Sequence, residues 1–210
     1  QHGTYHPRRA SGTCAAGSTV RQVNEEGSVV CEGHDTRPGF AITTLDSDGT
    51  IGQYTSTTTG ADGLGLISYY DASNGSLKVA HCNDTACSSS ALYTLDSSGS
   101  VGKYTSITIG ADGLGLISYY DSNNGDLKVA HCSDIACSAA IPYTLDSVGD
   151  VGQYTSITIG ADGLGLISYY DVSNGNLKVA YCSNSACSAA TLATLDPSAG
   201  AVGSYTSITI

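Results

Sequence analysis

The chain has 210 residues and a formal net charge of −11, with 26 glycines, one phenylalanine and no tryptophan or methionine. This length is enough for a sizeable core, and the abundance of Thr, Ser, Tyr, Ile, Val and Gly is typical of strands and turns. The negative charge argues against nucleic acid and anionic membrane as partners. No stretch approaches the roughly 20 apolar residues of a membrane-spanning helix, so we expect no membrane span.

Residues 1–38 are unlike the rest of the chain. Two short strands are predicted at Ser18–Val23 and Ser28–Cys31, and a disulfide between Cys14 and Cys31 would close this hairpin. The polar residues before it are expected to form a flexible tail or a contact arm. The first domain is therefore predicted to be an N-terminal arm with a disulfide-stapled hairpin.

Residues 39–210 are a tandem repeat with a period of about fifty residues. Three copies align without a gap, and a fourth is partial: 41–90, 91–140, 141–190 and 191–210. The string GADGLGLISYYD is identical at Gly60–Asp71, Gly110–Asp121 and Gly160–Asp171. A period in this range is typical of solenoids, propellers and arrays. It also weakens catalytic interpretations, because an active site is usually a single place.

Each repeat alternates in hydrophobicity with a period of two, in four segments bounded by turn residues. In the second copy the predicted strands are Tyr104–Ile109, Leu114–Asp121, Leu127–Cys132 and Ala139–Asp146. Four antiparallel strands in fifty residues, with no helical pattern, match a β-propeller blade. The predicted fold class is all-β, with four-stranded propeller-type blades in tandem behind the small cysteine-bounded hairpin.

The cysteines indicate the compartment. In addition to Cys14 and Cys31, each full repeat has one pair with four residues between its members: Cys82/Cys87, Cys132/Cys137 and Cys182/Cys187. The chain contains no CxxC or CxxCH, which argues against thioredoxin-like redox chemistry and covalent haem. A disulfide in every repeat requires an oxidising environment, so the protein is expected to be secreted or on the cell surface.

The string YTSITIGADGLGLISYYDxxNGxLKVAHC resembles the BNR/sialidase-like repeats of bacterial secreted β-propellers, over Gly39–Ile210. The N-terminal CAAGSTVRQVNEEGSVVCE looks like a cysteine-bounded module of bacterial surface and fibre proteins. The resemblance implies three whole blades, with an outer strand at Ala41–Asp46 and an inner strand at Tyr205–Ile210. Because closed propellers typically have 4–8 blades, either the chain is part of a longer protein or subunits complete each other's sheets.

Paired tyrosines followed by aspartate are the candidate ligand-binding residues. Neighbouring strand residues point to opposite faces, so one ring of each pair is expected to pack between blades while the other stacks on a sugar. The set is Tyr69, Tyr70, Asp71, Tyr119, Tyr120, Asp121, Tyr169, Tyr170 and Asp171. Packing of both rings is the favoured alternative.

Metal sites receive less support. His81 and His131 occupy equivalent positions of successive copies, which propeller blades hold apart, so blade packing is favoured over metal ligation. The DxDG at Asp46–Gly49 leaves calcium possible, although turn-forming aspartate is the preferred interpretation. No cofactor is expected.

The repeats contain no arginine, since Arg8, Arg9, Arg21 and Arg37 all precede them, and sialidases hold their substrate with an arginine cluster. The sequence therefore predicts no enzymatic activity. The first hypothesis is an extracellular structural or adhesive repeat protein that self-associates into a ring or filament by strand complementation. The second is a lectin-like propeller that binds glycans or other cell-surface partners.

Overall fold

The computed structural model describes residues 13–14, 18–23, 28–33, 42–197 and 202–210. The chain forms two compact units, Gln1–Ile42 and Thr43–Ile210. In the first unit, β1 (Ser18–Val23) pairs antiparallel with β2 (Val29–Gly33), and Cys14 is bonded to Cys31, so the predicted hairpin and its disulfide are confirmed. The expected arm and the boundary at residue 38 lie outside the described residues.

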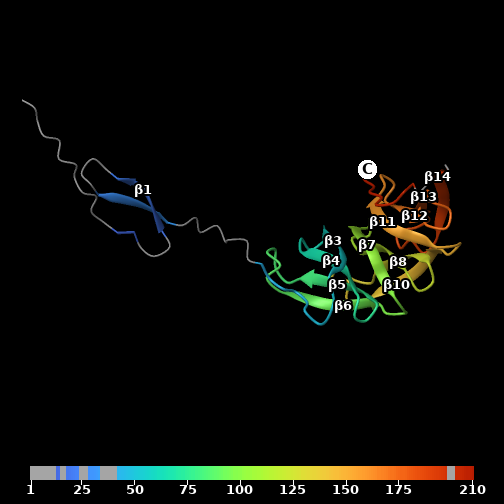
Figure 1. Ribbon diagram of the computed structural model, residues 1–210, viewed down its shortest axis with the longest axis horizontal. Helices are drawn as coiled ribbons and strands as arrows, with labels where there is room; N and C mark the ends of the chain where they lie inside the picture. Colours follow the sequence, from blue (N-terminus) through green and yellow to red (C-terminus); the bar gives the residue numbers. More distant parts are fainter. Residues whose placement is uncertain (1–12, 15–17, 24–27, 34–41, 198–201) are drawn as a thin grey trace, which may run out of the picture. The chain divides into compact units, whose positions relative to one another are not determined.

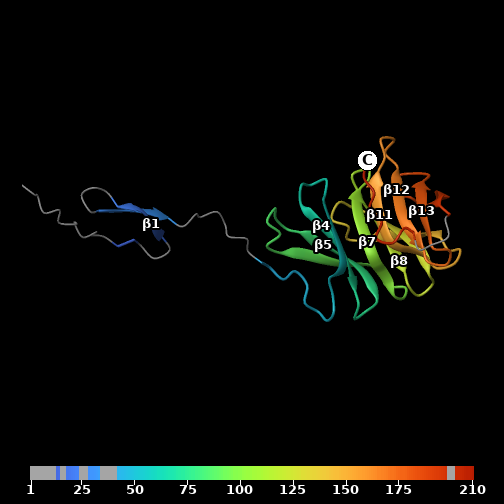
Figure 2. The ribbon, with the colours of Figure 1, turned by 45° about the horizontal axis from the view of Figure 1, so that its top comes forward.

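The second unit consists of three four-stranded antiparallel sheets, one for each repeat. In each sheet the strands are hydrogen-bonded in chain order, as in a propeller blade (Figures 1 and 2). The first blade contains β3 (Gln53–Thr59), β4 (Gly65–Asp71), β5 (Ser76–Cys82) and β6 (Ser90–Asp96). The second contains β7 (Val101–Ile109), β8 (Gly115–Asp121), β9 (Asp126–Cys132) and β10 (Ala140–Asp146). The third contains β11 (Val151–Ile159), β12 (Gly165–Asp171), β13 (Asn176–Cys182) and β14 (Ala190–Asp196).

The blades pack face to face through apolar side chains. β7 lies against β3 and β4, and β11 lies against β7 and β8, so the first strands run side by side along one margin of the stack. Between the second and third blades, Leu127 and Val129 are buried in one cluster with Ile167 and Tyr169. The corresponding residues of the preceding repeats form the cluster between the first and second blades. Each interface is therefore built from two different faces of the same repeat.

A β-bulge interrupts the first strand of every blade. In β7 the pairing with β8 shifts register between Lys103 and Ser106, and Tyr104 between them has a φ of +54°. Beyond the bulge the predicted alternation holds, since Thr105 and Ile107 are each 6% exposed. The bulge itself was not predicted, because strict alternation was assumed through Tyr104.

In the second and third blades, a glycine two residues before the tyrosine of the bulge permits close packing on the preceding blade. Gly152 has a φ of +100°, and a Cβ atom added there would lie 2.7 Å from Leu127 Cα. A side chain has no room against this backbone, and the positive φ independently favours glycine.

The two predicted end strands are not formed. Residues 42–46 and 204–210 are outside any strand. A strand requires a hydrogen-bonded neighbour in its sheet. In a complete blade, residues 42–46 would pair with a third strand and residues 206–210 with a second strand. Within the described part of the chain, neither segment has such a neighbour. The C-terminal segment still occupies the first-strand position of a further blade. The amide of Ile208 donates to Ser156 Oγ at 3.2 Å, as the amide of Ile157 does to Ser106 Oγ.

The three predicted repeat disulfides are also formed, at Cys82–Cys87, Cys132–Cys137 and Cys182–Cys187. Four disulfides in one chain indicate an oxidising environment. The described residues include no helix long and apolar enough to cross a membrane.

Candidate functional site

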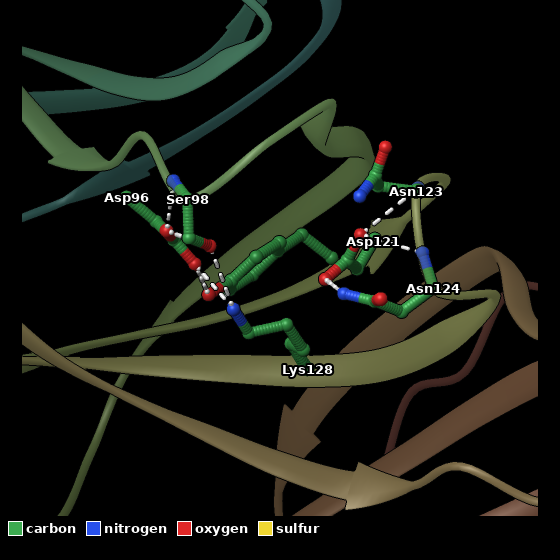
Figure 3. Close-up of polar contacts among 7 residues, drawn as sticks. Asp96, Ser98, Asp121, Asn123, Asn124 and Lys128 are labelled. Atoms are coloured by element: carbon green, nitrogen blue, oxygen red, sulfur yellow. Dashed lines mark hydrogen bonds and ion pairs between the residues drawn. The ribbon is translucent and has the colours of Figure 1, made fainter.

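The first tyrosine of each predicted ligand-binding pair is part of a buried polar cluster, which in the second and third blades lies between neighbouring blades. Tyr119 and Lys128 lie opposite each other on β8 and β9, and Asp96 reaches them from the last strand of the preceding blade. Asp96 Oδ2 accepts hydrogen bonds from the Tyr119 hydroxyl at 2.7 Å and from Lys128 Nζ at 2.6 Å, and Ser98 also donates to this carboxylate (Figure 3). The cluster ties consecutive blades together.

The same cluster recurs in the other two blades. Asp46 accepts from Tyr69 and Lys78 at 2.7 and 2.6 Å. Asp146 accepts from Tyr169 and Lys178 at 2.8 and 2.5 Å. The Asp46 carboxylate, proposed from sequence as a calcium ligand, is thus engaged by a lysine and a phenol. Among the described residues, no three His, Cys, Asp or Glu side chains are grouped closely enough to hold a metal ion.

Burial and hydrogen bonding act in opposite directions on these carboxylates. Burial raises the pKa of Asp96, but hydrogen bonds from Lys128, Tyr119 and Ser98 outweigh it, so the pKa of Asp96 lies below the ordinary 3.8. Burial, followed by the bond to Asp96, raises the pKa of Tyr119. At neutral pH the carboxyl group of Asp96 is therefore ionised and the phenol of Tyr119 is neutral.

The second tyrosine of the first two pairs also points into the protein, whereas Tyr170 in the third blade is half-buried. Tyr70 and Tyr120 are 5% and 6% exposed, and their hydroxyls bond to Ser100 at 2.8 Å and to Asp150 at 2.7 Å. Burial and then the bond to Asp150 raise the pKa of Tyr120 to about 12. Both rings of each pair contribute to packing, and sugar binding by them stays a prediction.

The aspartate after each pair shapes the turn that follows. Asp121 is 2% exposed, and its Oδ1 accepts the backbone amides of Asn123 and Asn124 at 3.0 and 3.2 Å (Figure 3). Its Oδ2 accepts the side-chain amide of Asn124 at 2.9 Å. Asp71 and Asp171 make the same contacts with Asn74 and Asn174. These carboxylates direct their oxygens at their own hairpins.

The histidines pair with the aspartate of the A-D-G turn in the same blade. His81 Nε2 lies 2.8 Å from Asp62 Oδ2, and His131 Nε2 lies 2.9 Å from Asp112 Oδ2. In the third blade the hydroxyl of Tyr181 occupies this position and bonds to Asp162. A phenol and an imidazole thus serve the same contact, which fits the predicted packing role.

A different set of tyrosines, absent from the sequence-based candidates, lies at the bulges of the three first strands and at the equivalent position of the C-terminal segment. We call Tyr54, Tyr104, Tyr154 and Tyr205 the tyrosine row. Their successive ring centroids are 4.6, 4.5 and 4.3 Å apart, and their φ angles are all between +53° and +57°. With the threonine that follows each of them, these residues line a shallow groove of about 280 Å³. The recurring dipeptide Tyr-Thr at the start of every inner strand could have identified the row.

Comparison with known protein families and with curated proteins gives no match. Among solved structures, an α-L-arabinofuranosidase from Lactobacillus brevis is similar with a TM-score of 0.49 and 10% identity, over 68% of this chain and 53% of that one. A GH43 β-1,3-galactosidase has a TM-score of 0.47 and 10% identity, over 70% and 39%. A fucose lectin from Kordia zhangzhouensis, solved with methyl-fucoside, has a TM-score of 0.40 and 13% identity, over 67% and 96%.

The chain spans about half the length of the arabinofuranosidase and less of the galactosidase. No family match confirms the BNR/sialidase resemblance; the propeller-type fold rests on the order and packing of the sheets. The expectation that the protein is not an enzyme is corrected here, because glycoside hydrolases are among the similar structures. The lack of arginine in the repeats excludes only a sialidase-type site. At these identities the similarity concerns the fold, and those proteins' activities are not transferred to this chain.

Proposed function

We propose that this chain is an extracellular structural or adhesive repeat module that associates head to tail through its first and third blades. The observation that carries the proposal is that, beside the segments 42–46 and 204–210, the apolar parts left exposed at the two ends belong to the two faces that meet between neighbouring blades. Four disulfides support an extracellular location.

The exposed face of the third blade repeats a buried face of the second. Leu127 and Val129 are 0% exposed between blades, whereas their counterparts Leu177 and Val179 are only half-buried. Those two residues line an open hollow of about 280 Å³ together with Ile208 of the C-terminal segment. The hollow is lined by the same kind of apolar side chains that the third blade covers on the second blade.

The exposed face of the first blade is the matching half. Ile67, Tyr69 and Ala80 line a hollow of about 260 Å³ with Ile51. In the third blade, the counterpart Ile167 is 0% exposed against the second blade. Contact between the third blade of one copy and the first blade of the next uses different patches on each copy. Such a heterologous contact produces a ring or a filament.

One substitution makes this end-to-end contact weaker than the internal ones. Thr57 is exposed on the first blade, where the later blades have Ile107 and Ile157, each 6% exposed. The hydroxyl of Thr57 reduces the free energy gained when this position is buried in a contact. Terminal repeats of repeat proteins commonly have such a more polar outer face. At about 0.8 kcal/mol per buried CH₂ and with the hydroxyl removed, Thr57→Ile is expected to strengthen association by about 1–2 kcal/mol, or roughly 5–30-fold.

Sedimentation velocity of the 210-residue chain over a range of concentrations tests the proposal. The chain is expected to associate with increasing concentration, Thr57→Ile to shift association to lower concentration, and Val179→Lys to abolish it. Ile141→Lys is the matched control, because Ile141 is 52% exposed on the outer strand β10. A chain that stays monomeric in wild-type and Thr57→Ile forms would contradict the proposal.

A further inference from the structure

The tyrosine row is one continuous aromatic surface and not one site per blade. Its rings are at most 4.6 Å apart between centroids and mutually tilted by 41–55°, so each ring contacts the next. Tyr104 and Tyr154 are half-buried, while Tyr54 and Tyr205 are 41% and 80% exposed at the two ends. The surface crosses three blades and the C-terminal segment.

Holding the row costs backbone strain in every repeat. A positive φ is unfavourable for a bulky residue, and each instance costs about 1–3 kcal/mol. Tyr205 follows Tyr154 by 51 residues, whereas the other spacings are 50, yet its φ of +57° and its ring contact are the same. The rings lie outside the buried apolar clusters between the blades and contact each other along the margin of the stack.

The groove beneath the rings presents an uncharged surface. It is lined only by the tyrosines and by Thr55, Thr105, Thr155 and Thr206. The hydroxyls of Thr105 and Thr155 are committed to Ser68 and Ser118 at 2.9 and 2.7 Å. The phenol hydroxyls also bond to one another, Tyr104 to Tyr54 and Tyr154, and Tyr154 to Tyr205, but a hydroxyl oxygen can accept a further hydrogen bond. The exposed parts of the rings and these oxygens therefore remain for a ligand.

The phenol of Tyr104, at the centre of the row, stays neutral at physiological pH. Burial, and then the hydrogen bond with Tyr154, raise the pKa of Tyr104. An apolar ring with a polar tip suits a ligand that has both C–H faces and hydroxyl groups. The chain's net charge of −11 opposes the approach of anions.

We propose that the tyrosine row binds a neutral saccharide, one per chain, whose C–H face stacks on the rings and whose hydroxyls bond to the phenols. The groove adjoins the two blade faces that we propose for assembly, sharing Thr55 with the hollow on the first blade and Thr206 with the hollow on the third. It is distinct from the buried pairs at Tyr69 and Tyr70 and from their equivalents, which would give one site in each blade.

Saturation-transfer NMR tests the proposal with methyl glycosides of neutral hexoses, pentoses and 6-deoxyhexoses, alongside sialic acid and glucuronic acid. The chain has 14 tyrosines and no tryptophan, so tyrosine fluorescence follows the titration and gives the stoichiometry. At least one neutral glycoside is expected to bind at one per chain. Binding of acidic sugars alone, binding of none, or three sites per chain would overturn the proposal.

The decisive variant is Tyr104→Gly. Glycine adopts a φ of +54° without strain, so the fold is expected to be retained while the centre of the row is lost. The affinity for the neutral glycoside is expected to fall at least tenfold, and Tyr205→Ala, at the exposed end, to weaken it less. Tyr143→Ala on the outer strand β10 is the matched control and is expected to leave binding unchanged. Equal binding by the Tyr104→Gly variant and the wild type would refute the site.

Discussion

Replacement of Lys128 by methionine removes the charge from a buried Tyr–Asp–Lys cluster while the apolar stem is kept. The side chains of Lys128 and Asp96 are 11% and 4% exposed, and the Nζ–Oδ2 distance is 2.6 Å. Loss of one partner from a buried ion pair typically costs 3–5 kcal/mol, because the other charge is left uncompensated. For a chain of this size, about 3–5 kcal/mol corresponds to a melting temperature lower by about 6–20 °C.

Urea denaturation at pH 7, followed by circular dichroism, measures this loss. Lys103→Met is the control, since it removes the same charge from a lysine that only lies over the Tyr70 ring, with Nζ 5.6 Å from the centroid. The control is expected to cost about 0.5–1 kcal/mol. If Lys128→Met cost no more than Lys103→Met, the cluster would not hold the blades together as argued.

The pH dependence gives an independent check on the same cluster. Because the folded-state pKa of Asp96 lies below 3.8, its contribution to stability is complete above the unfolded-state pKa and is lost as the pH falls through the folded value. Without Lys128, less of the free-energy cost of burying the charged Asp96 carboxylate is offset, and protonation of the carboxyl removes this cost. The difference between wild type and Lys128→Met is therefore expected to narrow below about pH 4. A difference that stays constant down to pH 2 would contradict this account.

Two further predictions use other contacts. Gly152→Ala is expected to destabilise the chain by more than about 3 kcal/mol, because the new Cβ would meet Leu127 backbone at 2.7 Å. Gly63→Ala, at a positive φ with nothing within 4 Å of the added Cβ, is expected to cost about 1 kcal/mol in the same urea assay; equal losses would refute the steric argument. His131→Tyr is expected to change stability by less than about 0.5 kcal/mol, because Tyr181 already fills this position in the third blade, whereas His131→Ala loses the hydrogen bond and about 1 kcal/mol. A tyrosine variant as unstable as the alanine variant in thermal melts would show that the two blades are not interchangeable here.

The blade architecture could be predicted from the sequence because period, alternation and turn residues all agree. Leu114–Asp121 was predicted as a strand, and Gly115–Asp121 is observed. The ends could not be predicted in this way. The alternation in residues 205–210 is the same as in Tyr104–Ile109, yet a strand needs a ladder partner, which the alternation does not supply.

The candidate site was harder to predict because tyrosines in similar sequence patterns have different environments in the structure. Tyr119 and Tyr104 both lie in alternating segments, and only the bulge between Lys103 and Ser106 separates a buried structural ring from one that faces a groove. A tyrosine rarely adopts a left-handed backbone conformation, so its presence in the sequence does not indicate a bulge with a positive φ. The recurring Tyr-Thr dipeptide marks these positions, but the contact between their rings is visible only once the blades are packed side by side.

The Tyr–Asp–Lys cluster has a consequence for how such chains lengthen. Each aspartate precedes its tyrosine by 23 residues and its lysine by 32, in all three blades. Both separations are shorter than the repeat but span the junction between blades. Duplication or deletion of one whole fifty-residue unit, starting at any point of its sequence, therefore leaves every remaining cluster with its three members. Recombination between the near-identical repeats can change the number of blades without requiring any interface to evolve anew.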